Sequence, residues 1–395
     1  GGQGHVGQGR QPARPRPSAE QLALNKALTS LDSPGAILEA LAAAAEAGTD
    51  LNATNLTTGL HRIASRGAGN KARLLRNPRI GALLQAVYAR LQENPSEFLE
   101  RELASVAWAV GKLEVRVGPL LTELRAECVR RGPRGFNWHD VSNITWAHAV
   151  AAERGEGWET CVGMLARDAE ERPLEQCAPQ ALSNIVWALG TLGVQAPALL
   201  DRLSLHAVGV LSLSKFKPQE VSALAWGMAV GGHRSKAFFG AVEEAVVSRD
   251  LEGYNAQKMA TILCAFTEAG CPGESLFDMC EEAIIERAMA GFNPSNTASV
   301  AWSFARSGLA TEDLLTTVEE RVWQMGMQGF EDVQLVLLVW ALAAAKYRGP
   351  SGNNGRDTLS MVEVELRRRK IKRWPDENLA TVVWAFTRQG PPGGG

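Results

Sequence analysis

The sequence predicts an all-α protein, a right-handed α-solenoid of about nine two-helix repeats of roughly 38 residues. A tryptophan recurs at nearly constant spacing, and a second, mostly aromatic position recurs ten residues before it. The first marker is Trp108, Trp146, Trp187, Trp226, Cys264, Trp302, Trp340 and Trp384. The second marker is Phe98, Phe136, Cys177, Phe216, Tyr254, Phe292, Phe330 and Trp374. Because both markers keep one register, the chain is an array of one repeated unit.

The elements follow from composition along the chain. Residues 1–18 are rich in Gly, Pro and Arg and almost free of apolar side chains, so we expect a disordered tail. Residues 19–48 carry two helical patterns separated by Ser33-Pro34-Gly35 and predict a capping pair. Residues 49–390 form the repeat array, which begins with a divergent unit marked by Leu51 and His61. Residues 391–395 predict a second disordered tail.

Each repeat predicts two helices. The first helix starts at a proline such as Pro179 or Pro218, because proline is favoured in the first helical turn. It ends at a glycine, for which the candidates are Gly193, Gly231, Gly270, Gly308 and Gly390. The second helix follows, for example over 199–211, 237–248, 274–289 and 311–325. No segment alternates as a strand does, so we expect no sheet.

A helical wheel separates two sides of the first helix. Positions two and five before the tryptophan and two after it are apolar, as in Leu182, Ile185 and Leu189. Positions seven and three before it and four after it form a narrow polar stripe. The tryptophan lies at the border, and its Ala, Val and Ile neighbours favour burial between layers. The alternative is a ladder of indoles on which nucleic-acid bases stack.

Several repeats resemble a known group of organelle proteins. The segments at 180–193 (QALSNIVWALGTLG), 140–147 (DVSNITWA) and 52–64 (NATNLTTGLHRIA) carry the resemblance. They resemble octotricopeptide repeats and the related helical repeats of FAST-kinase-like and RAP-associated proteins, including the subunit-6-type domain of RNA-editing substrate-binding complexes. The resemblance spans about residues 20 to 390. Cys264 and His61 depart from it at the tryptophan position, and no RAP domain follows the array, so no nuclease-like function is carried over.

The resemblance implies a function and a location. It implies binding of single-stranded organelle RNA in transcript processing, stability, editing or translation, in a mitochondrion or chloroplast. Other ribonucleoprotein subunits are possible partners. A formal net charge of -2 gives no general attraction for nucleic acid. A protein-binding scaffold, or a structural subunit of an organellar ribonucleoprotein, is therefore the alternative.

The polar stripe supplies most candidate RNA-binding residues. Amides and hydroxyls placed once per repeat suit the hydrogen-bonding edges of single-stranded bases. The first column holds His139, Gln180, Gln219, Gln257 and Ser295, and the second holds Ser105, Asn143, Asn184, Thr261, Ser299 and Thr381. The alternative is that these groups bond to nearby backbone.

Cations supply the candidate phosphate contacts. The third column of the stripe holds Lys112, Arg306 and Arg388. The densest basic run is Arg367, Arg368, Arg369, Lys370, Lys372 and Arg373. A run of this kind at the end of a helix can equally be a solvated surface that favours the helix dipole.

Other classes of function find no support in the sequence. No nucleophile elbow, phosphate loop or zinc-protease motif is present, so we expect no enzyme and no cofactor. The six cysteines show no metal-ligand spacing and indicate buried thiols, not a metal site. The longest uncharged stretch, 176–200, contains prolines and keeps the repeat register, so we expect no membrane partner.

Overall fold

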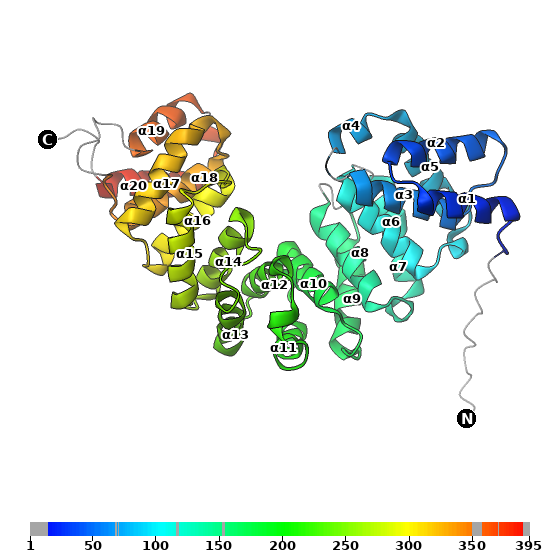
Figure 1. Cartoon of the computed structure of the whole chain (residues 1–395), viewed down its shortest axis with the longest axis horizontal. Coiled ribbons are helices and arrows are strands. Elements are labelled where there is room, and N and C mark those ends of the chain that lie inside the picture. The colour runs from blue at the N-terminus through cyan, green and yellow to red at the C-terminus, as the bar shows by residue number, and fades with distance from the viewer. Residues whose placement is uncertain are drawn as a thin grey trace. The chain divides into compact units, whose positions relative to one another are not determined.

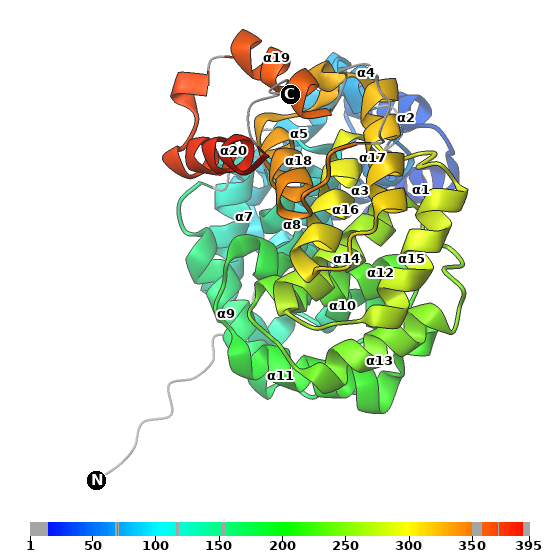
Figure 2. The same ribbon diagram turned by 90° about the vertical axis from the view of Figure 1, so that its left-hand side faces the viewer.

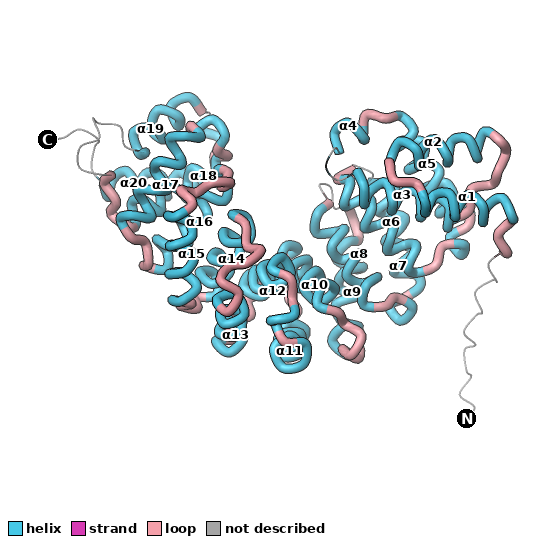
Figure 3. The backbone as a smooth tube through the Cα atoms, viewed as in Figure 1, coloured by secondary structure: helices cyan, strands magenta, loops and turns pink. Residues whose placement is uncertain are grey.

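The computed structural model describes residues 15–67, 69, 71–115, 118–151, 155–349, 358–369 and 371–389. All regular structure in these ranges is helical, as Figure 3 shows, which confirms the all-α prediction. The chain comprises two compact units, residues 1–199 and 200–395, which are described separately.

The first unit contains two rows of helices (Figure 1), in which each helix packs on the next of its own row. The A row consists of α3 (Ala53–Gly67), α6 (Glu100–Leu113), α8 (Trp138–Val150) and α10 (Pro179–Leu192). The B row consists of α5 (Pro78–Glu93), α7 (Gly118–Arg131) and α9 (Trp158–Glu171), with the short α4 (Lys71–Leu75) before α5. The predicted capping pair is α1 (Ala19–Ser30) and α2 (Pro34–Glu46), and both helices pack on α3.

The second unit repeats this arrangement, and Figure 2 shows its two rows from another side. Its A row consists of α12 (Pro218–Val230), α14 (Ala256–Ala269), α16 (Pro294–Ser307), α18 (Asp332–Ala344) and α20 (Asp376–Gln389). Its B row consists of α13 (Lys236–Val247), α15 (Glu274–Glu286), α17 (Glu312–Met325) and α19 (Thr358–Arg368). Helix α11 (Pro197–His206) continues into a π-helical turn, Ala207–Leu211. Packing in sequence order within each unit is the local architecture of an α-solenoid.

Most of the predicted helix ends are confirmed. Helices α10 and α12 begin at the expected prolines, and Gly193, Gly270 and Gly308 end their helices with positive φ. Gly231 is the C-cap of α12, as predicted, but it does not adopt the left-handed conformation. Its φ is -71°, and the next residue, Gly232, adopts φ of 84°. Of the remaining predictions on the termini, residues 1–14, Gly390 and the tail at 391–395 lie outside the described residues.

The aromatic marker ten residues before the tryptophan forms the core. All eight of its members are buried, from Phe98 at 0% exposed to Trp374 at 8%. The apolar side of the A row is also buried as the wheel predicts, including Leu182, Ile185 and Leu189. Small residues allow close approach between A-row helices. A Cβ added at Gly111 of α6 would lie 3.1 Å from the Ala147 Cα of α8.

The prediction that the tryptophans lie buried between layers was wrong. Seven members of that column, Cys264 included, are only partly buried, and Trp384 is 38% exposed. The physical reason is visible on the wheel at ~100° per residue. The tryptophan lies within about 60° of all three polar columns, so a side of the helix that exposes those columns also exposes part of the indole.

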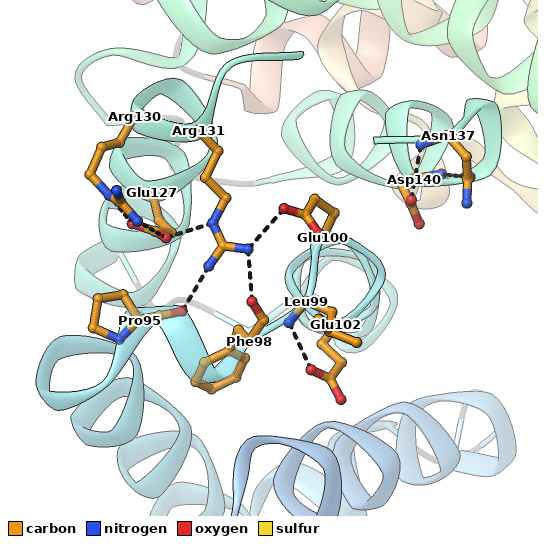
Figure 4. Close-up of polar contacts among 10 residues, drawn as sticks. All are labelled: Pro95, Phe98, Leu99, Glu100, Glu102, Glu127, Arg130, Arg131, Asn137 and Asp140. Atoms are coloured by element: carbon orange, nitrogen blue, oxygen red, sulfur yellow. Dashed lines mark hydrogen bonds and ion pairs between the residues drawn. The ribbon is translucent and has the colours of Figure 1, made fainter. Parts of the chain in front are cut away.

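Arginines at or near the ends of B-row helices bond to the backbone that precedes the A helix of the same repeat. In Figure 4, Arg131 at the end of α7 donates to the carbonyl oxygens of Phe98 and Pro95, each at 2.7 Å, and to Glu127 at 2.6 Å. The carbonyl that precedes the A helix is the acceptor in other repeats too. The corresponding donors are Arg172 to Phe136, Arg249 to Phe216, Arg321 to Phe292 and Arg369 to Phe330. These arginines hold the core aromatic position in place and are not surface charges.

Candidate functional site

In each unit, the exposed side of the A-row helices carries the same pattern of positions, which we call the stripe. It comprises the positions seven and three before the marker, the marker itself and the position four after it. Spacings of three and four residues place all four positions on one helix face. Nearly every described side chain at these positions is half-buried or exposed, and Asn143, at 7% exposed, is the exception. The predicted polar columns are therefore accessible, and the indoles lie among them.

Neighbouring rings of the marker column contact one another at two places. In the first unit, the ring centroids of His61 and Trp108 are 4.8 Å apart. In the second unit, the indoles of Trp340 and Trp384 stack at 6.3 Å with an interplanar angle of 21°. The Arg388 guanidinium lies 5.4 Å from the Trp384 ring centroid. At these two places, adjacent repeats thus present neighbouring aromatic rings.

Burial, followed by the nearby His139 and Arg62, lowers the pKa of His61. This imidazole is therefore neutral near pH 7. It contributes a flat ring to the column, as the tryptophans do, and not a positive charge.

The amides and serine hydroxyls of the stripe are more available than the hydroxyls of Thr261 and Thr381. Within the described ranges, the side chains of Gln180, Gln219 and Asn184 form no hydrogen bond. The same holds for the side chains of Gln257, Ser295, Ser105 and Ser299. By contrast, Thr261 and Thr381 donate to the carbonyls four residues earlier, each at 2.8 Å. These two hydroxyls fit the backbone-bonding alternative as donors, although each oxygen can still accept a bond.

His139 and Asn143 form a pair on α8. The Asn143 amide nitrogen lies 3.4 Å from His139 Nδ1. His139 is exposed and Asn143 is buried, so the amide orients the imidazole at the surface.

Charge on the stripe is sparse but mainly positive. Arg306 and Arg388 are exposed and Lys112 is half-buried. The stripe also contains Arg101, which the sequence analysis did not select, and the carboxylates of Glu268 and Glu377. The described stripe positions therefore hold four cations and two carboxylates, although the whole chain has a formal net charge of -2.

The predicted basic run divides into different roles. Arg369 is committed to the fold, because it bonds to the Phe330 carbonyl and to Asp332 and Glu365. Arg367 pairs with Glu363 while remaining 76% exposed. Arg368 and Arg373 are exposed, whereas Lys370 and the side chain of Lys372 lie outside the described residues. Only part of the run is thus placed to contact a phosphate.

The first repeat contributes polar residues that the sequence analysis passed over. Thr54 and Thr58 occupy the first two stripe columns of α3, and Arg101 continues the first column on α6. Applying the column spacing to His61 would have found the two threonines, and applying it to Trp108 would have found Arg101. Together with residues of α1 they line a recess in the first unit.

The described residues contain no cluster of three or more His, Cys, Asp or Glu side chains arranged to hold a metal ion. Among the helices formed by these residues, none combines the length and apolar character that crossing a bilayer requires. No protein-family model matches the chain, and comparison with curated proteins finds no match.

Proposed function

We propose that this chain binds single-stranded RNA along the stripe and acts in the processing, stability, editing or translation of organelle transcripts. The observation that carries the proposal is the position of the tryptophan column. Partly exposed aromatic rings and unpaired amides share one helix face in successive repeats. Single-stranded RNA recognition uses this combination, because unstacked bases need a flat apolar partner and a polar partner for their edges.

The two kinds of residue have different energetic roles. Stacking of one base on an aromatic side chain contributes about 1 to 3 kcal/mol and tolerates any base. Amides such as Gln180 and Asn184, two columns of one helix, supply discrimination between bases. The few cations of the stripe supply phosphate contacts. Affinity therefore depends more on stacking than on charge, which accommodates the negative net charge of the chain.

Several finer features belong to the same proposal. We infer a right-handed solenoid of about nine repeats from the sequence period. A mitochondrial or chloroplast location follows from the resemblance alone. The chain acts as a binding protein with no catalysis of its own, and other ribonucleoprotein subunits are its further partners.

A binding titration tests the proposal. Fluorescence anisotropy of labelled single-stranded RNA is measured with the full chain and with the double variant Gln180→Ala/Asn184→Ala. We expect the variant to change the preference among RNA sequences more than the total affinity, since base contacts specify and phosphate contacts position. Gln92→Ala is the matched control, because Gln92 is an exposed amide on the B-row helix α5. Equal binding profiles for all three proteins would leave the stripe amides with no role in recognition.

A protein-binding scaffold is the second candidate, and one observation favours it. Leu205, Val208 and Val210, on α11 and its π-helical turn, are 74%, 39% and 68% exposed. Apolar side chains gathered on a surface often mark a protein contact. If the chain binds no RNA, and Leu205→Ser/Val210→Ser abolishes association with a ribonucleoprotein subunit, the scaffold function replaces the RNA-binding one.

A further inference from the structure

The stripe deepens into a recess at one place in the first unit. The recess has a volume of ≈ 550 Å³, within the range of about 300 to 1,000 Å³ that is typical of small-molecule sites. Three successive A-row helices, α3, α6 and α8, form its floor, and α1 adds a wall with Asn25 and Thr29. Because α1 belongs to the capping pair, the wall exists only where this pair covers the array.

Unpartnered polar groups line this recess. Thr57 is only 5% exposed, and its hydroxyl has no hydrogen-bond partner among the described residues. The Asn25 side-chain oxygen and the Arg62 Nε are also buried without a partner there. Leaving a buried polar group unpaired costs about 1 to 3 kcal/mol. A ligand that supplies the missing partners would recover this cost.

The carboxylates in the recess are already engaged in helix capping. Glu102 accepts from the Leu99 N–H and from the Thr54 hydroxyl, each at 2.8 Å. Asp140 accepts from the Asn137 N–H at 3.1 Å, and Figure 4 shows both capping contacts to backbone. These two charges balance those of Arg62 and Arg101. The charges of the lining therefore sum close to zero.

A lining with almost no net charge suits the base of a nucleotide better than its phosphate. Mixed donors and acceptors match the edge of a nucleobase, whereas a phosphate would require a clear excess of cations. His61 lies in the recess with its ring beside Trp108 and offers a stacking face. Arg101 is exposed, and it forms no ion pair with the described residues, so a phosphate can reach it from solvent.

We propose that this recess holds one nucleotide, with its base against His61, its base edge at Thr57 and Asn25, and its phosphate at Arg101. The inference rests on the proposed function when the nucleotide belongs to an RNA strand, and it fixes where on the stripe that strand is held. The same chemistry would accept a free nucleoside monophosphate.

The test compares two substitutions of Thr57 in the full chain. Thr57→Val removes the hydroxyl and keeps the shape, whereas Thr57→Ser keeps the hydroxyl. Anisotropy titrations use labelled oligo(A), oligo(C), oligo(G) and oligo(U), and calorimetric titrations use the corresponding free nucleoside monophosphates. We expect Thr57→Val to weaken the preferred ligand about 3- to 10-fold and to reorder the ligands, and Thr57→Ser to bind as the unmodified chain does.

A second variant tests the phosphate contact. Arg101→Gln should lower the slope of log affinity against log salt for RNA by about 0.7. Arg167→Gln makes the same charge change at an exposed position of α9 and should leave the slope unaltered.

The outcomes separate this inference from the proposed function. RNA strands can bind in such a way that the Gln180→Ala/Asn184→Ala variant changes the ranking of the sequences and Thr57→Val does not. In that case the inference about the recess is wrong and the proposal of RNA binding along the stripe stands. If no strand binds but a free nucleotide does, and Thr57→Val weakens it, the recess stands and RNA binding is wrong. Binding of neither ligand overturns both.

Discussion

The buried arginine at the end of α7 predicts a large difference between two adjacent substitutions. Arg130 and Arg131 both bond to Glu127, but the Arg131 side chain is 3% exposed and that of Arg130 is 58% exposed. Arg131→Met removes the donor to the Phe98 carbonyl and one of the two donors to the Pro95 carbonyl, which keeps the bond from the Phe98 N–H. It also removes one of the two cations that bond to the Glu127 carboxylate, which is only 4% exposed.

Removing one partner of a buried ion pair costs about 3 to 5 kcal/mol, because the remaining charge stays desolvated. We place Arg131→Met near the lower end, at about 3 kcal/mol, because Arg130 still bonds to Glu127. Arg130→Met should cost at most about 1 kcal/mol, as exposed pairs do.

Urea denaturation followed by circular dichroism measures both free energies of unfolding. Acid titration adds a second readout. Burial raises the pKa of Glu127, but hydrogen bonds from the two arginines outweigh burial and lower it overall. The stabilisation is thus present above the unfolded-state pKa and is lost as pH falls through the folded-state value. Arg131→Met should weaken this acid dependence. Equal losses of stability for the two variants would refute the structural role of Arg131.

Three further outcomes follow from burial and charge. Burial lowers the pKa of His148 to about 4, from 6.5. On acidification the unfolded state therefore binds a proton before the folded state does, and the free energy of unfolding falls by up to about 3 kcal/mol between these two pKa values. His148→Gln should remove this pH dependence in denaturation curves. Phe216→Ala should cost about 3 to 5 kcal/mol and Trp226→Ala less, because only Phe216 is fully buried; equal melting temperatures would contradict this. Arg368→Gln should weaken the binding of all RNA sequences alike without a loss of protein stability, whereas Arg369→Gln should lower the melting temperature of the protein.

The sequence predicted the helical class because its markers keep one register over the whole array. Helix starts at Pro179 and Pro218 were predictable from local chemistry, since proline is favoured in a first turn. The C-cap at Gly231 was predictable too. Which residue there adopts the left-handed conformation was not, because the following Gly232 is also a glycine and either can adopt it.

The role of the tryptophans could not be judged from their neighbours alone. Apolar residues beside Trp187 in sequence point to other sides of the helix, so they say little about what covers the indole itself. The buried core is formed by the other marker, ten residues before the tryptophan. This position varies more in residue type, since it includes Cys177 and Tyr254, and all its members are buried. Because its residue type varies, this marker gave a weaker sequence signal than the tryptophan column did.

The candidate site was only partly accessible to sequence reasoning. Periodicity found the stripe amides, because one position per repeat is visible in the chain. It could not separate Arg368 from Arg369, since only three-dimensional packing brings the Phe330 carbonyl to the second of these. The recess was also hidden, because its wall comes from α1, which lies outside the repeat register.

Ultraviolet crosslinking of bound single-stranded RNA, followed by identification of the crosslinked peptides, tests the central claim most directly. The account predicts crosslinks on the A-row helices, at the tryptophan column and the polar positions beside it, in both units. Crosslinks confined to the B-row helices, or no bound RNA at any salt concentration, would contradict it.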